Sequence, residues 1–176
     1  MSWMQTATGR QFWPLAPRPE DVCAADIAHA LSNLCRYGGH CRRFYSVAEH
    51  SVLVARHVPR EHRLWALLHD AAEAYLVDVP RPIKPHLRGY ATAERRLMRV
   101  ICKRFGLPLE MPREVKAADN AILLDEAAQN MEPPPALWSV NAEPLGVKLK
   151  FWTPRRARYE FLAALERYAR DGGGHA

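Results

Sequence analysis

The chain has 176 residues, of which 48% are hydrophobic and 25% are charged, and its formal net charge is +6. This composition can build one hydrophobic core, and it excludes a disordered chain, a fibrous repeat and a small disulfide-bonded scaffold. The positive charge favours an anionic partner, such as a phosphorylated small molecule or a nucleic acid, but it is equally typical of a basic surface without a specific partner.

The cysteine spacing and the lack of long apolar segments bear on where in the cell the protein is located. No two of the four cysteines have C-x-x-C spacing, which predicts free thiols in a reducing environment. Residues 1–20 lack a basic start followed by an apolar run, and no later segment has about 18 consecutive apolar residues. We therefore expect a cytoplasmic protein that does not insert into a membrane.

The first predicted helix covers residues 21–37 and ends at a pair of glycines. The second begins at a capping box formed by Ser46 and Glu49 and should run to residue 58. In a capping box the serine side chain accepts a hydrogen bond from a backbone N–H, and the glutamate reaches back to the cap.

A third helix is expected as one piece over residues 61–76, because its apolar residues recur at helical spacing. Three prolines in residues 79–85 exclude a helix interior there and predict an extended, stiff loop. Further helices are expected over residues 91–105 and 114–131. A last helix is expected over residues 153–170, because a threonine and a proline open it.

Strand patterns are nearly absent outside Val140 and residues 146–149. The elements therefore predict an all-α fold, a compact helical bundle. We expect one domain that covers the whole chain, with its core at about residues 21–170. Residues 1–20 should form an N-terminal extension, and the glycine-rich residues 171–176 should form a flexible tail.

The third predicted helix carries polar residues opposite its apolar stripe. At roughly 100° per residue, His69, Asp70 and Glu73 fall on this side together. Such a face is usually only solvated. An adjacent histidine and aspartate can, however, both approach one ion and supply a nitrogen and an oxygen ligand.

His50 and Asp119 each lie on a mostly apolar stripe of their own helix. His50 shares its stripe with Val54 and should point inward, as either a hydrogen-bonded core residue or a ligand. Asp119 shares a stripe with Ile122 and Glu126, but a second apolar face of that helix leaves its direction open. If Asp119 does point inward, it needs a partner, because an unpaired buried charge is costly.

The order of these motifs resembles the H…HD…D signature of HD-domain phosphohydrolases. It is carried by AEH at 48–50, LLHDAAEAY at 67–75 and AADNAILLDEA at 117–127. Closer still, RYGGH and FYSVAEHS followed by HDAAEAYLVDVPRPIK resemble small 5′-deoxynucleotidase-like members and phage deoxynucleoside triphosphohydrolases. The resemblance covers roughly residues 25–165 and implies a bundle of the HD-domain type.

The resemblance implies one divalent metal ion, with cobalt, manganese or zinc as candidates and magnesium as a further one. Its ligands would be His50, His69, Asp70 and Asp119. Members with two metals need two more histidines between the HD pair and the last aspartate, where this chain has only His86. Such an ion can activate water and neutralise phosphate charge, which predicts phosphoester hydrolysis.

Roles for residues beside the metal also follow from the resemblance. Glu73, in HD-x-x-E, would hydrogen-bond the attacking water, although it also fits an exposed helix glutamate. Asp78 would protonate the leaving oxygen or orient water. Lys84 resembles a phosphate-binding lysine, and Pro82 could shape the nucleotide pocket.

Arg36 and Tyr37 resemble an arginine and aromatic pair that contacts phosphate and sugar or base. They precede His50 by about fourteen residues, a spacing close to that of the family. If Arg36 does not serve, the phosphate-binding cation could be another basic residue of the same loop. These residues are His40, Arg42 and Arg43.

The resemblance predicts a metal-dependent phosphohydrolase that acts on nucleotides, and it favours a 5′-deoxynucleotidase that releases phosphate from deoxynucleoside monophosphates. The alternative is a deoxynucleoside triphosphate triphosphohydrolase that releases tripolyphosphate. A distant alternative is a nucleic-acid-binding module built on the arginine-rich last helix, whose apolar residues more simply pack onto the bundle. We expect a homo-oligomer, a dimer or larger, with a nucleotide ligand and neither a membrane nor a nucleic-acid partner.

Overall fold

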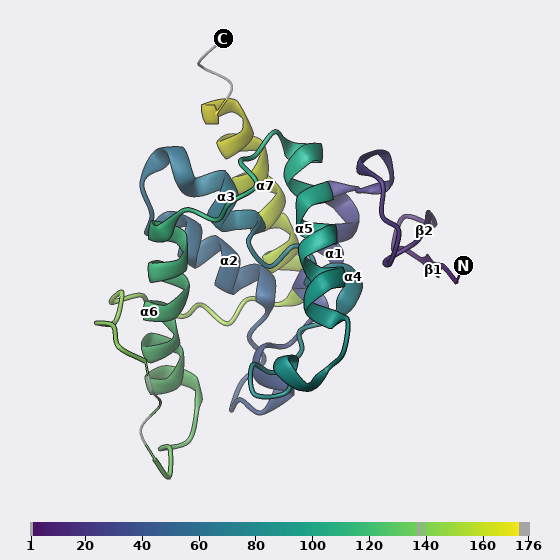
Figure 1. The fold of residues 1–176 in the computed structure, drawn as a ribbon. Helices are drawn as coiled ribbons and strands as arrows, with labels where there is room; N and C mark the ends of the chain where they lie inside the picture. The colour runs from purple at the N-terminus through teal and green to yellow at the C-terminus, as the bar shows by residue number, and fades with distance from the viewer. Residues whose placement is uncertain (1, 137, 139, 173–176) are drawn as a thin grey trace.

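The computed structural model describes residues 2–136, 138 and 140–172. Most of these residues are helical, as the sequence predicts (Figure 1). The α-helices are α1 (Ala24–Asn33), α2 (Val47–Arg56), α3 (Arg63–Leu68), α4 (Glu73–Leu76), α5 (Tyr90–Phe105), α6 (Arg113–Asn130) and α7 (Pro154–Gly172). Short 3-10 helices precede or separate them: η1 (Pro19–Asp21), η2 (Arg36–Gly39), η3 (Arg60–His62) and η4 (Lys84–His86).

The helix α2 lies at the centre of the core. Its residues from Val47 to Ala55 are all buried, because α2 packs against α1, α3, α6 and α7. A helix covered on several sides can be apolar over most of its circumference. The polar residues Glu49, His50 and Ser51 are therefore carried into the interior by the packing of their neighbours.

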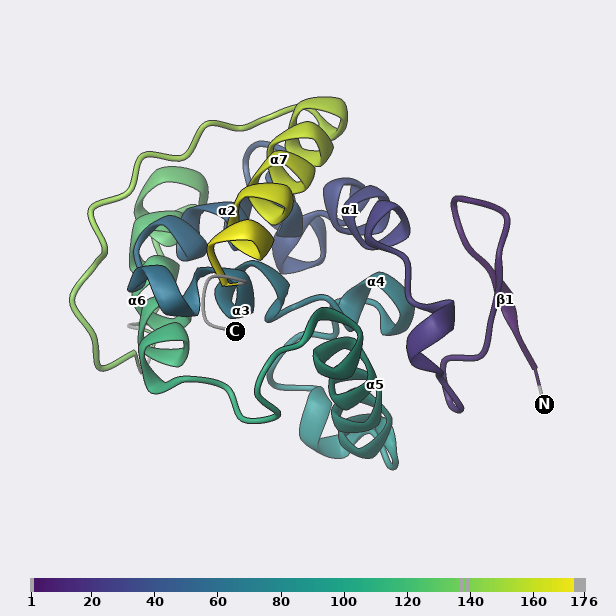
Figure 2. The same ribbon diagram turned by 90° about the horizontal axis from the view of Figure 1, so that it is seen from above.

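A small hairpin at the N-terminus was not predicted. Strand β1 (Met4–Gln5) pairs antiparallel with β2 (Gln11–Phe12), whereas Val140 and residues 146–149 form no strand. Figure 2 shows the hairpin beside α1, on the side away from α6. Phe12 is fully buried and stacks on Tyr75 of α4 at a ring-centroid distance of 4.0 Å, which ties the hairpin to the bundle.

The first predicted helix is shorter than expected. It ends at Asn33 because the following residues pair with the segment that precedes α2. The Val47 N–H donates to the Leu34 carbonyl at 3.0 Å, and the Arg36 N–H donates to the Tyr45 carbonyl at 2.9 Å. This pairing holds Arg36 and η2 next to the start of α2.

The third predicted helix is broken at the His-Asp motif. It divides into α3 and α4, and residues 69–72 form turns. The Ala71 N–H donates to the Leu68 carbonyl at 3.0 Å, and the Glu73 N–H donates to the Asp70 carbonyl at 2.9 Å. These bonds span three residues and wind the chain more tightly than an α-helix does.

Half of the predicted capping box is present. The Glu49 N–H donates to the Ser46 hydroxyl at 3.1 Å, as expected. The Glu49 carboxylate does not return to the cap. It accepts backbone N–H bonds from Lys150 and Phe151 at 2.6 and 2.9 Å, and from Trp152 at 2.6 Å. This Glu49 clamp fastens the segment before α7 to α2, which ends at Arg56 instead of residue 58.

The proline-rich loop turns instead of extending. Residues 81–83 form a turn, followed by η4. The Pro80 carbonyl accepts hydrogen bonds from the Ile83 and Lys84 N–H groups at 2.8 and 3.2 Å. Pro85 fits η4 because a proline in the first helical turn loses no hydrogen bond.

The later helices agree with the predicted bounds within a few residues. α5 ends at Phe105 and is followed by Gly106, whose φ of 66° favours glycine. The Thr153 hydroxyl caps α7 by accepting from the Arg156 N–H at 3.3 Å. α7 includes the first two residues of the predicted tail, and residues 173–176 lie outside the described part of the chain. No helix of that part is long and apolar enough to cross a membrane.

Two rows of side chains along α6 have different partners. Asp119, Ile122 and Glu126 are buried against the bundle. Asp125 accepts backbone N–H bonds from Leu145 and Gly146 at 2.8 and 3.1 Å. The connection from α6 to α7 is thus held along the outside of α6, and the inner row is left for other contacts.

Candidate metal centre

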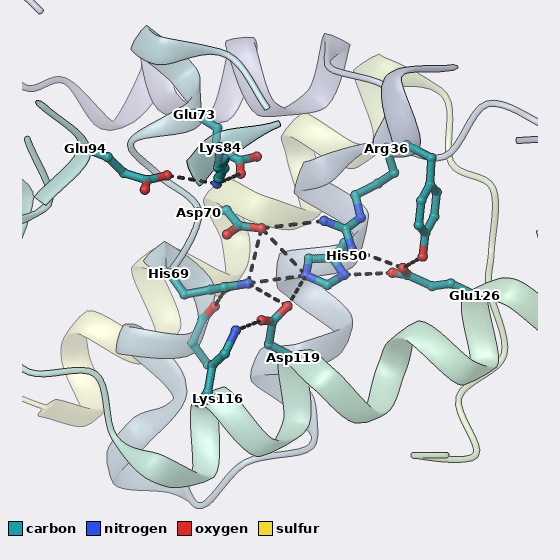
Figure 3. A network of polar contacts seen from close by, with 12 residues as sticks. Arg36, His50, His69, Asp70, Glu73, Lys84, Glu94, Lys116, Asp119 and Glu126 are labelled. Atoms are coloured by element: carbon teal, nitrogen blue, oxygen red, sulfur yellow. Dashed lines mark hydrogen bonds and ion pairs between the residues drawn. The ribbon is translucent and has the colours of Figure 1, made fainter. Parts of the chain in front are cut away.

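Residues from three separate elements meet beside the centre of α2 (Figure 3). His50 comes from α2, His69 and Asp70 from the turn after α3, and Asp119 from α6. His50 is fully buried, and His69 and Asp119 are 6% and 9% exposed. His50, His69 and Asp119 form a buried group that could hold a metal ion.

The distances within this group suit a small cation. The Nε2 atoms of His50 and His69 lie 3.3 Å apart, and Asp119 Oδ1 lies 3.4 and 3.6 Å from them. Asp70 Oδ2 lies 3.2 Å from His69 Nε2 and 3.7 Å from His50 Nε2. Ligand atoms about 2.1 Å from one tetrahedral ion are about 3.4 Å from each other.

The Nδ1 atom of each histidine, on the side of the ring away from the centre, has a hydrogen-bond partner. His50 Nδ1 lies 2.7 Å from Glu126 Oε1, and His69 Nδ1 lies 2.7 Å from the Ala66 carbonyl. Both partners can only accept, so each Nδ1 carries a hydrogen and donates it. When these rings are neutral, each presents its Nε2 lone pair to the centre, which is the arrangement of histidines that bind metals.

The electrostatics of the site call for positive charge at its centre. Burial alone would raise the pKa of Asp119, but the adjacent imidazoles of His50 and His69 hold it well below its usual value. Burial opposes a charge on His69, yet Asp70 and Asp119 raise the pKa of its imidazole well above the usual range. Carboxylates gathered around two imidazoles thus favour a bound cation, whether a proton or a metal ion.

Glu126, which the sequence did not assign to the site, lies directly behind His50. Its side chain is fully buried, and it accepts hydrogen bonds from His50 at Oε1 and from Arg36 and Tyr37 at Oε2. Burial opposes its charge, but Arg36 and His50 lower the pKa of Glu126 to about 2. The one sequence signal was its position on the stripe of Asp119, seven residues later.

Arg36 and Tyr37 lie beside the centre, as the resemblance implies. Arg36 Nη2 is 3.1 Å from Glu126 Oε2, and Arg36 Nη1 is 3.8 Å from Asp70 Oδ2. Tyr37 directs its hydroxyl at Glu126 from a backbone with φ of 58°. Of the other cations proposed for this loop, Arg42 donates to the Gln129 carbonyl and Arg43 stacks on a phenylalanine, whereas His40 is exposed.

Glu73 and Lys84 form the opposite side of the site. Lys84 Nζ lies 3.0 Å from Glu94 Oε1 and 3.8 Å from Glu73 Oε1 (Figure 3). Glu73 Oε2 is buried and has no hydrogen-bond partner in the described part of the chain. Burial and the charges of Asp70 and Asp78 raise the pKa of Glu73 to about 9.

The remaining predicted residues lie further out. Asp78 is partly exposed and acts on Glu73 through its charge, and no hydrogen bond or ion pair of Asp78 is present among the described residues. Pro82 is exposed on the loop before η4. Lys116, which was not predicted, pairs with Asp119 Oδ2 at 2.8 Å, so Asp119 has one oxygen for this lysine and the other for the histidines.

Comparison with known proteins identifies relatives but no activity. The chain is 43% identical over 126 residues to the uncharacterized protein YfdR of Escherichia coli, covering 72% of this chain and 71% of YfdR. It is 39% identical over 142 residues to an uncharacterized protein of Rhodobacter capsulatus, covering 73% and 72% of the two chains. No protein-family model matches the sequence.

Proposed function

The chain belongs to the same family as YfdR of Escherichia coli, and from its buried site we propose that it is a metal-dependent phosphohydrolase of the HD-domain type that acts on nucleotides. One observation carries the proposal. Two imidazoles with occupied Nδ1 atoms direct their Nε2 lone pairs toward two carboxylates within 3.2–3.7 Å. Such an arrangement of lone pairs is stable only around a cation.

The proposed ligands are His50, His69, Asp70 and Asp119. A divalent ion held by them would activate water and neutralise charge on a phosphate, which is the chemistry of phosphoester hydrolysis. Asp70 is proposed as the fourth ligand because its Oδ2 approaches both Nε2 atoms. Arg36, whose Nη1 faces Asp70, would hold a phosphate oxygen of the substrate.

Glu73 is proposed as the group that handles protons. Its free Oε2 lies in a buried environment next to Asp70, and a carboxyl with a raised pKa can hold a proton near neutral pH. It would donate this proton to the leaving oxygen, and the carboxylate formed in this way could then accept a proton from water. Asp78 would assist from the rim, through its charge and by orienting water.

The charges around the site support a monophosphate substrate. Among the described residues, three cations beside the centre have carboxylate partners: Arg36 pairs with Glu126, Lys84 with Glu94, and Lys116 with Asp119. A triphosphohydrolase needs further cations for the β- and γ-phosphates. We therefore propose that the enzyme cleaves deoxynucleoside monophosphates into nucleoside and inorganic phosphate.

A nucleotide panel tests this proposal. The purified protein is loaded in turn with cobalt, manganese or zinc and incubated with each deoxynucleoside monophosphate and the matching triphosphate, and the products are separated by ion-exchange chromatography. Phosphate and nucleoside from the monophosphate are expected, with Asp119→Ala as the inactive control. Tripolyphosphate from the triphosphate, with the monophosphate intact, would establish a triphosphohydrolase. Salt-sensitive nucleic-acid binding without any hydrolysis would overturn both.

A further inference from the structure

We infer that Glu126 is a positioning residue that fixes the metal-binding nitrogen of His50 and couples it to Arg36 and Tyr37. The part of the inference that concerns the metal depends on the geometry of the site. The part that concerns the substrate rests on the proposed function, in which Arg36 and Tyr37 hold the nucleotide.

Glu126 uses both of its oxygens (Figure 3). Oε1 lies 2.7 Å from His50 Nδ1. Oε2 accepts from Arg36 Nη2 at 3.1 Å and from the Tyr37 hydroxyl. The side chain is fully buried, so water does not compete for these bonds, and one carboxylate joins α2, α6 and η2.

The three partners require a carboxylate at this position. All of them are donors, and a carboxylate has only acceptor atoms. A glutamine would turn its NH₂ group toward at least one donor. The charge of Glu126 also matches the buried guanidinium of Arg36, which would otherwise be costly to remove from water.

The bond to His50 decides which ring nitrogen faces the metal site. With Nδ1 held as a donor, the ring cannot turn over, and Nε2 presents its lone pair. Without this acceptor, the imidazole could flip or change tautomer and direct an N–H group at Asp70 and Asp119, which lie 3.7 and 3.4 Å from His50 Nε2. Glu126 thus prepares His50 for a cation.

Glu126 Oε2 also positions the residues proposed to bind the substrate. Arg36 reaches Glu126 with Nη2 and faces Asp70 with Nη1, so one guanidinium touches both a positioning residue and a proposed ligand. Any change in how Arg36 is held alters the environment of both. Because coupling between two binding sites is reciprocal, a bound metal should favour the nucleotide, and a bound nucleotide should favour the metal.

Glu49 provides a matched control, because it is also a fully buried glutamate on an element of the site and is next to His50 in sequence. It accepts only backbone N–H bonds from Lys150, Phe151 and Trp152. If Glu126 were purely structural, its loss would resemble that of Glu49. Both would lower the melting temperature, and neither would change metal affinity in the folded protein.

The experiment measures metal binding without any turnover. Metal-free wild type, Glu126→Gln, Glu126→Asp and Glu49→Gln are titrated with Co²⁺ or Mn²⁺ by calorimetry, at a temperature where circular dichroism shows each to be folded. Visible absorption of bound Co²⁺ reports the ligand geometry. Glu126→Gln should weaken binding ~10–100-fold, the usual scale for losing the hydrogen-bond acceptor of a metal-binding histidine, and alter the Co²⁺ spectrum. Glu49→Gln should lower the melting temperature and leave the Kd within about twofold.

Tyr37→Phe distinguishes the role of Glu126 toward His50 from its role toward Arg36 and Tyr37. It removes one donor to Oε2 and leaves the His50 bond in place. Its metal Kd should stay within about threefold of the wild type, while the KM for the nucleotide rises. Calorimetry with and without nucleotide should show tighter metal binding in its presence for the wild type, and a smaller gain for Glu126→Gln.

The outcomes distinguish this inference from the proposed function. Unchanged metal affinity in Glu126→Gln, or an equal loss in Glu49→Gln, would overturn the role of Glu126 even in an active enzyme. Weaker metal binding in Glu126→Gln, with no hydrolysis by the wild type, would keep that role and reject the proposed activity. If Glu126→Gln fails to fold, Glu126→Asp decides, because it keeps the charge for Arg36 but has a shorter reach to His50, and an unchanged Kd there would also refute the inference.

Discussion

Glu49 and His50 are neighbours on α2 and both are fully buried, but their polar atoms face different kinds of partner. Every donor to Glu49 is a backbone N–H group, held in place by the segment before α7. His50 faces the side chains of His69, Asp70 and Asp119, and a single proton cannot join all of the facing nitrogen and oxygen atoms.

This difference shows that burial of a polar group does not by itself identify a functional site. The Glu49 clamp is complete without a ligand, because fixed dipoles satisfy both oxygens. The metal centre is complete only when a cation joins its lone pairs. Substitutions in the clamp should therefore change stability, and substitutions in the metal centre should change ligand binding and turnover.

The largest effect is expected for Asp119→Ala, which removes an oxygen directed at both histidines. The variant should lose bound metal, and turnover should fall by at least ~1,000-fold, because the metal supplies several kcal/mol of transition-state stabilisation. Plasma emission spectrometry on the purified variant measures the metal, with His69→Ala as a parallel. Normal metal content in Asp119→Ala would disprove the ligand assignment.

The next effect in size is expected for Glu73→Ala, which lies in the site but is not a proposed ligand. Metal and nucleotide should still bind, and turnover should fall by ~100-fold, the usual scale for losing an acid–base group. Single-turnover kinetics on the metal-loaded variant would measure this fall. Near-normal turnover would show that Glu73 is only a buried helix residue.

Glu49→Gln should show the reverse behaviour of the metal-centre variants. Its NH₂ group would meet backbone donors in the clamp, so we expect a loss of about 2 kcal/mol in the free energy of unfolding. Urea denaturation of the metal-free protein measures this loss, while kcat per folded molecule should stay close to that of the wild type. A large fall in kcat without a change in stability would show that the Glu49 clamp acts on turnover, as the metal centre does.

The smallest effect concerns the stability of the metal-free protein as a function of pH. The pKa of Glu73 is raised from 4.5 to about 9 by burial, Asp70 and Asp78. Its contribution to stability is therefore fully present below about pH 4.5 and is lost as the pH rises through 9. Glu73→Gln does not titrate, so it should match the wild type near pH 5 and exceed it by at least about 1 kcal/mol at pH 8. Equal denaturation midpoints at both pH values would contradict the raised pKa.

Local signals predicted the helices whose ends depend on neighbouring residues. Gly106 ends α5 and Thr153 opens α7 through contacts within a few positions of the chain. The break between α3 and α4 escaped prediction because i→i−3 turns and an α-helix carry almost the same apolar pattern. Sequence periodicity reports which side is buried and not which hydrogen bonds are made.

The centre was accessible to sequence reasoning only in part. His50 and Asp119 lie on apolar stripes, and the order of motifs placed them with His69. The roles of Glu126 and Glu49 were not accessible, because Glu126 meets an arginine 90 residues away and Glu49 meets a backbone segment beginning 101 residues away. Helical periodicity left two faces of α6 open, and only the packing of η2 and α2 against α6 selects the face that carries Glu126.

The seven-residue spacing of Asp119 and Glu126 on α6 fixes the distance between a proposed metal ligand and the residue that holds His50. The two residues are about two turns and 10.5 Å apart along one helical face. One inserted or deleted residue between them would rotate Glu126 by about 100° around the helix axis relative to Asp119. The two side chains would then no longer face the same site. The stretch from Asp119 to Glu126 should therefore tolerate no change in length.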